Sequence, residues 1–293
     1  MEKFSGFTWG YLFPVCKLAA LVPYLNCKRN NSRLPDKWQM FTIMHILFVI
    51  FVAIGYNKLV SFFYTKEIFV LAFQILDIFG YPLSIIFNFL IILKRGPEIY
   101  STLEYFSKTM KNLTNLLPFS KRKTRILNFL FYYFICQVVV NFCIAFFTSY
   151  DTYLGIFYPL TLLYSNCELL LMDLNFCVFV LNAKYLFQIF NEKLQNIKKG
   201  KKKEFLKELQ KFRGIYEDCC GIVGLIEKCF VGFATINTVI EFSGFVYGAY
   251  GIYCIPTFIN VIHVAYWTSF YICKIVVKLY VCSSTTKEVN LFH

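Results

Sequence analysis

Six long runs of apolar residues constrain how this chain can fold more than any other feature. They cover residues 40–57, 68–93, 126–150, 153–182, 226–250 and 252–280. A helix needs about 20 mostly apolar residues to cross a bilayer core that is about 30 Å thick. The runs are too long for strands of a membrane β-barrel, and none alternates steadily between apolar and polar residues. Because each backbone amide in lipid must be satisfied within its own segment, we predict an all-α polytopic membrane protein with six transmembrane helices.

The composition of the 293 residues agrees with this fold class. Hydrophobic residues make up 58% of the chain and charged residues only 16%, whereas a soluble domain is nearer one quarter charged. The formal net charge is +13, which by itself is compatible with a nucleic-acid partner. The excess of apolar residues argues against nucleic-acid binding, a disordered chain and a small disulfide scaffold.

The distribution of positive charge predicts the orientation of the six helices. With the N-terminus inside, 28 of the 30 Lys and Arg residues fall on the cytoplasmic side, and only Lys58 and Lys66 fall outside. Cytoplasmic loops are enriched in Lys and Arg, so both termini are predicted to be cytoplasmic. We expect a plasma-membrane protein with a cytoplasmic segment 1–39, a transmembrane domain 40–281 and a cytoplasmic tail 282–293.

The apolar N-terminal stretch 4–25 has two interpretations. Pro14, Lys17 and Pro23 interrupt it, and its basic cluster follows the apolar part instead of preceding it. A secretory signal has the opposite order. We therefore interpret it as a helix at the membrane surface, with a cleaved signal as the alternative.

No motif of an enzyme or a metal site stands out. The sequence has no phosphate-binding loop, His-Glu-x-x-His motif or Cys-x-x-Cys pair. His45 and His263 lie on different predicted helices and have no partner at the spacing of metal ligands. We therefore expect no catalytic residue, metal or cofactor, and the chain is not predicted to be an enzyme.

Two channel classes are excluded by the same runs. The fourth predicted helix lacks the repeated Arg residues of a voltage sensor. The fifth and sixth are joined by a few residues around 250–252, which leaves no room for a re-entrant selectivity loop.

Polar side chains at membrane depth are candidates for function, because they are costly in lipid. Acids occur in the second, fourth and fifth helices, Asp173 in the fourth among them, and many aromatic residues surround them. Polar groups in an aromatic-walled cavity are typical of small-molecule sites. We predict an outer ligand pocket in which three acids act as polar anchors. The residues predicted to line it are Asp77, Glu168, Glu241, Tyr164, His263, Tyr266 and Trp267. The alternative is that the acids form hydrogen bonds between helices.

A heptad pattern follows the fourth helix on the cytoplasmic side. Its apolar positions are spaced by four and three residues, at Phe205, Leu209, Phe212, Tyr216, Cys219 and Val223. We predict a cytoplasmic helical hairpin over about 183–225, with its turn in the Lys-rich stretch 198–203. The heptad positions are expected to pack within this hairpin or against another subunit.

Three local runs resemble one receptor family. The stretch from Phe212 to Phe230 (FRGIYEDCCGIVGLIEKCF) is similar to the region before the fifth span of insect gustatory receptors. The stretch from Cys282 to Val289 (CSSTTKEV) is similar to the one after their sixth span, and the stretch from Leu12 to Leu18 (LFPVCKL) is similar to their opening. The predicted cytoplasmic N-terminus also matches this family.

The resemblance implies a tastant-gated, non-selective cation channel that assembles as a homo- or hetero-tetramer with other gustatory receptor subunits. In that family the tastant pocket is formed by the second to sixth helices, and a seventh helix with a Thr-Tyr…Gln-Phe pattern lines the pore. The printed sequence stops at His293 without such a helix. An incomplete gene model or a shortened isoform is the favoured interpretation, and a non-conducting subunit is the third. The alternative function is a transporter or a membrane-embedded enzyme.

Overall fold

The structure is a computed structural model that describes the helical residues between 157 and 290, together with scattered helical residues in 86–109 and 128–143. Some side chains within these helices, those of 157–165 among them, are outside the description. The predicted span 40–57, most of 68–93 and the N-terminal segment also lie outside the described residues. Every described residue with regular secondary structure is helical, which confirms the all-α class for this part of the chain.

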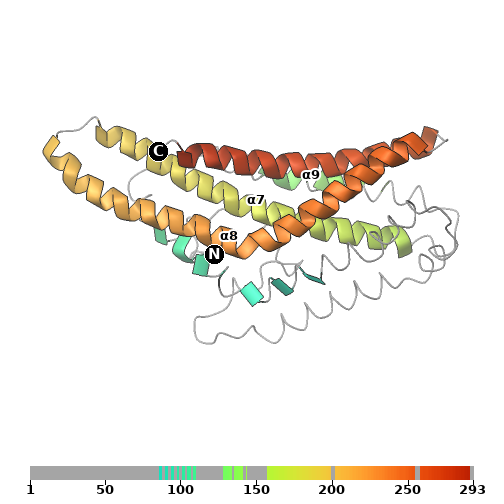
Figure 1. The fold of residues 1–293 in the computed structure, drawn as a ribbon, viewed down its shortest axis with the longest axis horizontal. Helices are drawn as coiled ribbons and strands as arrows, with labels where there is room; N and C mark the ends of the chain where they lie inside the picture. The colour runs from blue at the N-terminus through green and yellow to red at the C-terminus, as the bar shows by residue number, and fades with distance from the viewer. Residues whose placement is uncertain are drawn as a thin grey trace.

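Three long helices dominate the described part. They are α7 (Phe157–Lys198), α8 (Lys202–Cys254) and α9 (Phe258–Asn290). The first half of α8 lies beside α7, and its second half crosses toward α9 (Figure 1). Two stretches, Asn166–Gln195 and Val264–Asn290, are long and apolar enough to cross a membrane. A third candidate combines Phe212–Gly232 with Ala234–Tyr253, which are bent by 47° relative to each other.

The lengths of α7 and α8 exceed the thickness of a bilayer. Their 42 and 53 residues correspond to about 63 Å and about 80 Å at about 1.5 Å per residue. A membrane core is only about 30 Å thick, so a spanning helix of this length extends well beyond it. The two helices are connected by three residues after Lys198, at the position where the sequence places the hairpin turn.

The connection between α8 and α9 lies later than expected. Residues 250–252, the predicted junction, belong to α8, which ends at Cys254, and α9 begins at Phe258. Pro256 accounts for the position at which α8 ends. It has no backbone N–H, and it disfavours helical geometry in the preceding residue.

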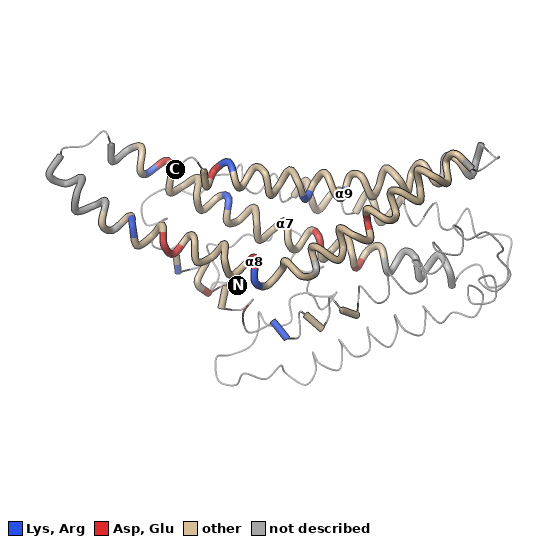
Figure 2. The backbone as a smooth tube through the Cα atoms, viewed as in Figure 1, with Lys and Arg blue, Asp and Glu red and all other residues tan. Residues whose placement is uncertain are grey.

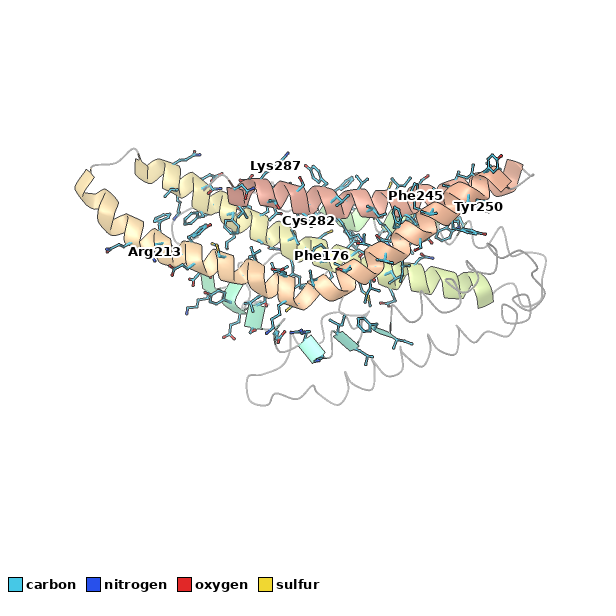
Figure 3. The ribbon with its side chains drawn as sticks, viewed as in Figure 1. Phe176, Arg213, Phe245, Tyr250, Cys282 and Lys287 are labelled. Atoms are coloured by element: carbon cyan, nitrogen blue, oxygen red, sulfur yellow. The ribbon has the colours of Figure 1, made fainter. Side chains whose placement is uncertain are left out.

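The core is centred on α7, which is buried on most sides. Among the described residues, its interior side chains include Leu170, Phe179, Leu186 and Phe187, each at most 2% exposed. The ring of Phe179 lies 4.6 Å from that of Phe230 on α8, and the ring of Phe176 lies 6.2 Å from it. Figure 3 labels Phe176 where α7 and α8 lie together.

The hairpin is held by aromatic packing. The Phe190 ring lies 5.5 Å from Phe212 and 5.7 Å from Tyr216, and Phe187 lies 6.4 Å from Tyr216. Phe212 and Cys219 are buried, whereas Val223 is 37% exposed. Two of the predicted heptad positions, Phe212 and Tyr216, therefore pack against α7 within the chain, as in the first of the two expected alternatives.

Hydroxyl side chains in these helices bond to their own backbone. Thr235, Thr238 and Ser243 on α8 donate to the carbonyl four residues earlier, at 2.7–2.9 Å. Thr268 and Ser269 on α9 do the same at 2.7 and 2.6 Å. Such bonds satisfy a hydroxyl without water, which suits a helix in contact with lipid.

The end of α9 is fastened to α7. The Gln188 side chain donates to the Glu288 carboxylate at 2.8 Å, and the Asn191 amide donates to the Glu288 backbone carbonyl at 2.9 Å. Thr285 and Val281 are buried. These contacts keep residues 282–290, the predicted tail, helical as far as Asn290.

Two glycines allow α8 to approach α9 closely. A Cβ atom built on Gly244 would lie 2.8 Å from the Tyr271 ring, and one on Gly248 would overlap the Thr268 side chain. The Gly-x-x-x-Gly spacing therefore marks a contact between two helices, as such patterns do in membrane proteins.

We expect Gly248→Ala to destabilise this contact. The added methyl group must displace Thr268, whose hydroxyl is bonded to its own helix, and overpacking of this kind costs about 1–3 kcal/mol. The matched control is Gly224→Ala, because a Cβ there meets nothing within 4 Å; it should keep or raise stability. Thermal unfolding of the purified variants in detergent, followed by circular dichroism, measures both. Equal midpoints for the two variants would contradict the contact.

Candidate functional site

Four charged side chains meet where α7, α8 and α9 lie together. Asp173 comes from α7, Glu241 from α8, and Lys274 and Lys278 from α9. All four are buried, with exposures between 1% and 6%. We call them the four-charge cluster. Figure 2 shows charged residues in the middle of these helices, whereas α8 beyond Glu241 and α9 before Lys274 carry no Lys, Arg, Asp or Glu.

Each lysine contacts both acids. The Lys274 ammonium lies 2.9 Å from a Glu241 oxygen and 3.4 Å from an Asp173 oxygen. The Lys278 ammonium lies 3.2 Å from Asp173 and is also hydrogen-bonded to Glu241. Two positive and two negative charges are thus paired in a closed arrangement that links three helices.

Neighbouring groups complete the cluster. Lys278 also donates to the Thr238 hydroxyl at 3.3 Å, and the Asn237 amide donates to Asp173 at 3.2 Å. The Lys274 ammonium lies 5.3 Å from the centre of the Phe270 ring, at a cation–π distance. The contacts of Lys274 with the acids have ion-pair distances without hydrogen-bond geometry, so Lys278 supplies the directional bonds.

The cluster is neutral as a whole, and this neutrality makes it tolerable in an apolar interior. An unpaired buried charge is strongly destabilising, whereas a fully paired set largely offsets its desolvation. The two lysines lie one helical turn apart, so both ammonium groups reach the same pair of carboxylates. The register of α9 against α7 and α8 is therefore specified by charge as well as by shape.

The two lysines of this cluster were not predicted from the sequence as site residues. Lys274 and Lys278 were counted with the cytoplasmic charges, although they are buried among α7, α8 and α9. The sequence nevertheless contained a signal for this pairing. Two lysines four residues apart in an apolar helix need acidic partners, and Asp173 and Glu241 were the acids at similar depth. For Glu241 the structure favours pairing between helices, the second of its two interpretations.

Glu168 differs from the other buried acids. It is 5% exposed, and its Oε2 atom has no hydrogen-bond partner. It precedes Asp173 by five residues, which is about 140° around the helix and about 7.5 Å along it. Glu168 thus lies on another side of α7, outside the four-charge cluster, and its position as a polar anchor stays a prediction.

Two of the aromatic residues predicted for the pocket, Tyr266 and Trp267, lie in the first half of α9. The Tyr266 hydroxyl donates to Gln137 of the helical stretch around 128–140 at 2.8 Å. The Trp267 ring lies 5.9 Å from Tyr266, 5.9 Å from Phe270 and 6.4 Å from Tyr271. Tyr266 and Trp267 are therefore adjacent to each other, about two turns from Lys274.

The remaining predicted site residues are not described in full. Tyr164 lies in α7 and His263 in α9, but their side chains are outside the described set, and Asp77 lies outside it altogether. Within the part of the chain that the structure describes, no group of three His, Cys, Asp or Glu side chains is arranged to hold a metal ion.

A second polar contact joins the stretch 91–109 to the first half of α8. The Tyr105 hydroxyl donates to the Asp218 carboxylate, and this bond raises the pKa of Tyr105 to about 12. Glu98 contacts Lys228 at 3.2 Å and accepts a bond from Arg95 at 2.8 Å, which lowers the pKa of Glu98. As residue numbers rise from 98 to 105, their partners fall from 228 to 218, so the two helices run antiparallel.

We expect Lys278→Met to destabilise the protein by roughly 3–5 kcal/mol, because it leaves two carboxylates with one cation in a buried site. The pair Glu241→Gln with Lys278→Met restores neutrality and should cost less than Lys278→Met alone. Neutralising the exposed pair Arg213 and Glu217, whose side chains are 82% and 65% exposed, should change little. Chemical unfolding in detergent compares the three variants. A double variant less stable than the single one would contradict a charge-paired cluster.

Tyr105→Phe should lower stability below pH 10 and have less effect at higher pH. The pKa of Tyr105 is raised to about 12 in the folded protein from an ordinary value near 10. Its hydrogen bond therefore contributes fully below pH 10, by about 1 kcal/mol, and this contribution is lost as the pH rises from about 10 through about 12. Unfolding of the two proteins between pH 8 and 12 measures the difference. Tyr253→Phe, at the 89% exposed Tyr253, is the matched control and should leave stability unchanged.

Comparison with known proteins identifies the family. The family model described as 7tm chemosensory receptor matches residues 10–291, which is nearly the whole chain. No curated protein matches the sequence at a significant level. The match agrees with the apolar helices, with the absence of strands among the described residues and with the resemblance to insect gustatory receptors. The chain belongs to the 7tm chemosensory receptor family, whose members are membrane receptors.

Proposed function

We propose that this chain is a gustatory-type receptor subunit of the plasma membrane that binds a small tastant and gates a non-selective cation current. The family match over residues 10–291 is the observation that carries the proposal. Apolar helices long enough to cross a membrane support it. In this proposal the subunit works in a homo- or hetero-tetramer with other gustatory receptor subunits.

The proposed tastant site lies in the outer half of the helices, on the side of the four-charge cluster away from the hairpin. Two features of the described residues support this position. Residues 242–254 of α8 and 258–273 of α9 contain no Lys, Arg, Asp or Glu. The rings of Tyr266 and Trp267 pack with those of Phe270 and Tyr271 in this part of α9. Small-molecule sites are mostly apolar, with a few polar groups that orient the ligand.

Glu168 is the polar group that we propose for ligand recognition. It is buried, and one carboxylate oxygen has no hydrogen-bond partner. A buried acceptor without a partner is costly, and a ligand with hydroxyl or amine donors would remove that cost. The proposed ligand class is therefore a small molecule with hydrogen-bond donors.

The test is two-electrode voltage clamp on cells that express the printed sequence alone or with a second gustatory receptor subunit. Sugars, amino acids and alkaloids are applied in turn. We expect inward current only in the presence of an active compound. Uptake of the compound without current would contradict the channel proposal and would favour a transporter.

Glu168→Gln should raise the half-maximal concentration of an active compound about two- to tenfold. An ordinary hydrogen bond contributes about 0.5–1.5 kcal/mol, which corresponds to about two- to tenfold in affinity. Glu217→Gln on the exposed side of α8 is the matched control and should leave the concentration unchanged. An unchanged dose–response curve for Glu168→Gln, with normal surface expression, would remove Glu168 from the site.

A further inference from the structure

The four-charge cluster lies at the middle of α9. Lys274 comes sixteen residues after Phe258 and sixteen residues before Asn290, the two ends of the helix. At about 1.5 Å per residue, each arm is about 24 Å long. The cluster therefore divides one continuous helix into two arms of equal length. We call residues 258–273 the outer arm and residues 275–290 the inner arm.

The two arms of α9 differ in their polar partners, although the outer arm also packs on α8 at Gly244 and Gly248. The outer arm is bonded through Tyr266 to Gln137 and packs its aromatic rings together. The inner arm is bonded through Glu288 to Gln188 and Asn191 on α7. Helix α9 itself, together with the helices that the cluster joins to it, is thus a continuous route from one set of contacts to the other.

The chemistry of the cluster allows α9 to tilt and resists its sliding. A lysine ammonium is a compact charge with three rotatable donors on a flexible stem, so ion pairs tolerate small changes of angle. Sliding by a turn would take one lysine away from both carboxylates and leave buried charge unpaired, which is strongly unfavourable. Lys278 also donates to the Thr238 hydroxyl on α8 at 3.3 Å, from the same flexible stem.

We propose that the four-charge cluster is a pivot that couples the outer arm of α9 to its inner arm. A change at the outer arm tilts α9 about Asp173 and Glu241 and so alters the contacts of Glu288 with α7. In the proposed receptor, this is how a ligand in the outer half would act on the cytoplasmic hairpin. The inference deepens the proposed function and rests on it only for the role of the ligand, since the coupling itself exists without one.

The test perturbs one arm and observes the other, without any ligand. Tyr266→Phe removes the hydroxyl that donates to Gln137. Hydrogen–deuterium exchange of residues 282–290 is then measured by mass spectrometry on the purified full chain in lipid nanodiscs. With the cluster intact, Tyr266→Phe should change the exchange rate of this segment about fivefold or more, the lower range of coupling between distant sites.

The same perturbation is repeated with the cluster weakened but still neutral. In the background Glu241→Gln with Lys278→Met, Tyr266→Phe should change exchange of residues 282–290 less than twofold. The background Asp173→Asn with Lys274→Met serves the same purpose if the first one does not fold. As a matched control, Arg213→Gln with Glu217→Gln neutralises an exposed pair on α8 and should preserve the fivefold response.

An equal response in the intact and weakened backgrounds would overturn the pivot, and so would no response in the intact background. Either result leaves the proposed receptor function standing, because no tastant enters the measurement. Conversely, a chain that gives no current with any tastant would still show the coupling between the two arms of α9 if the pivot exists. The two proposals therefore fail in distinguishable ways.

Discussion

The pairing of charge in an apolar interior is the constraint on which the rest of this structure depends. Asp173, Glu241, Lys274 and Lys278 come from three helices, and each would be costly in the core without the others. Apolar packing can accept several rotations and shifts of a helix at similar cost. Four charges that must meet within about 3 Å accept very few, so the cluster selects one arrangement of α7, α8 and α9.

Other contacts extend this arrangement away from the cluster in both directions. Toward the hairpin, the rings of Phe187, Phe190 and Phe212 pack α8 onto α7. In the opposite direction, Gly244 and Gly248 let α8 approach Tyr271 and Thr268 of α9. Helix α8 therefore changes partner along its length, from α7 to α9. The 47° bend that begins after Gly232, where the helix backbone is least restrained by side chains, accompanies this change.

Part of the fold follows directly from sequence patterns. Long apolar runs indicate α7 and α9, and the heptad spacing through Phe212, Tyr216 and Cys219 indicates the hairpin, because both depend on local periodicity. The junction between α8 and α9 was placed around residues 250–252 because hydropathy alone was followed there. Pro256, a local signal in the same sequence, gives the better position.

The site was less predictable, because a single sequence does not show which polar groups meet. Charge counting assigned Lys274 and Lys278 to the cytoplasm by their place near the end of an apolar run. Their true partners are more than 30 residues away on α8 and about 100 residues away on α7. Two lysines four residues apart in an apolar run call for acidic partners, but the predicted spans contain more than two acids, and the sequence does not say which of them pair.

The separation of Glu168 from the cluster has a consequence for recognition. The two lysines neutralise Asp173 and Glu241, so these acids have little charge to offer a ligand. Glu168 lies about 140° around the helix from Asp173, because it precedes Asp173 by five residues. One helix thus carries two acids of similar burial with different roles: Asp173 holds the bundle together, and Glu168 keeps an acceptor oxygen without a partner. A change of helix face is enough to keep one acid in the charge pairing and leave the other outside it, which is the separation that the proposed ligand site requires.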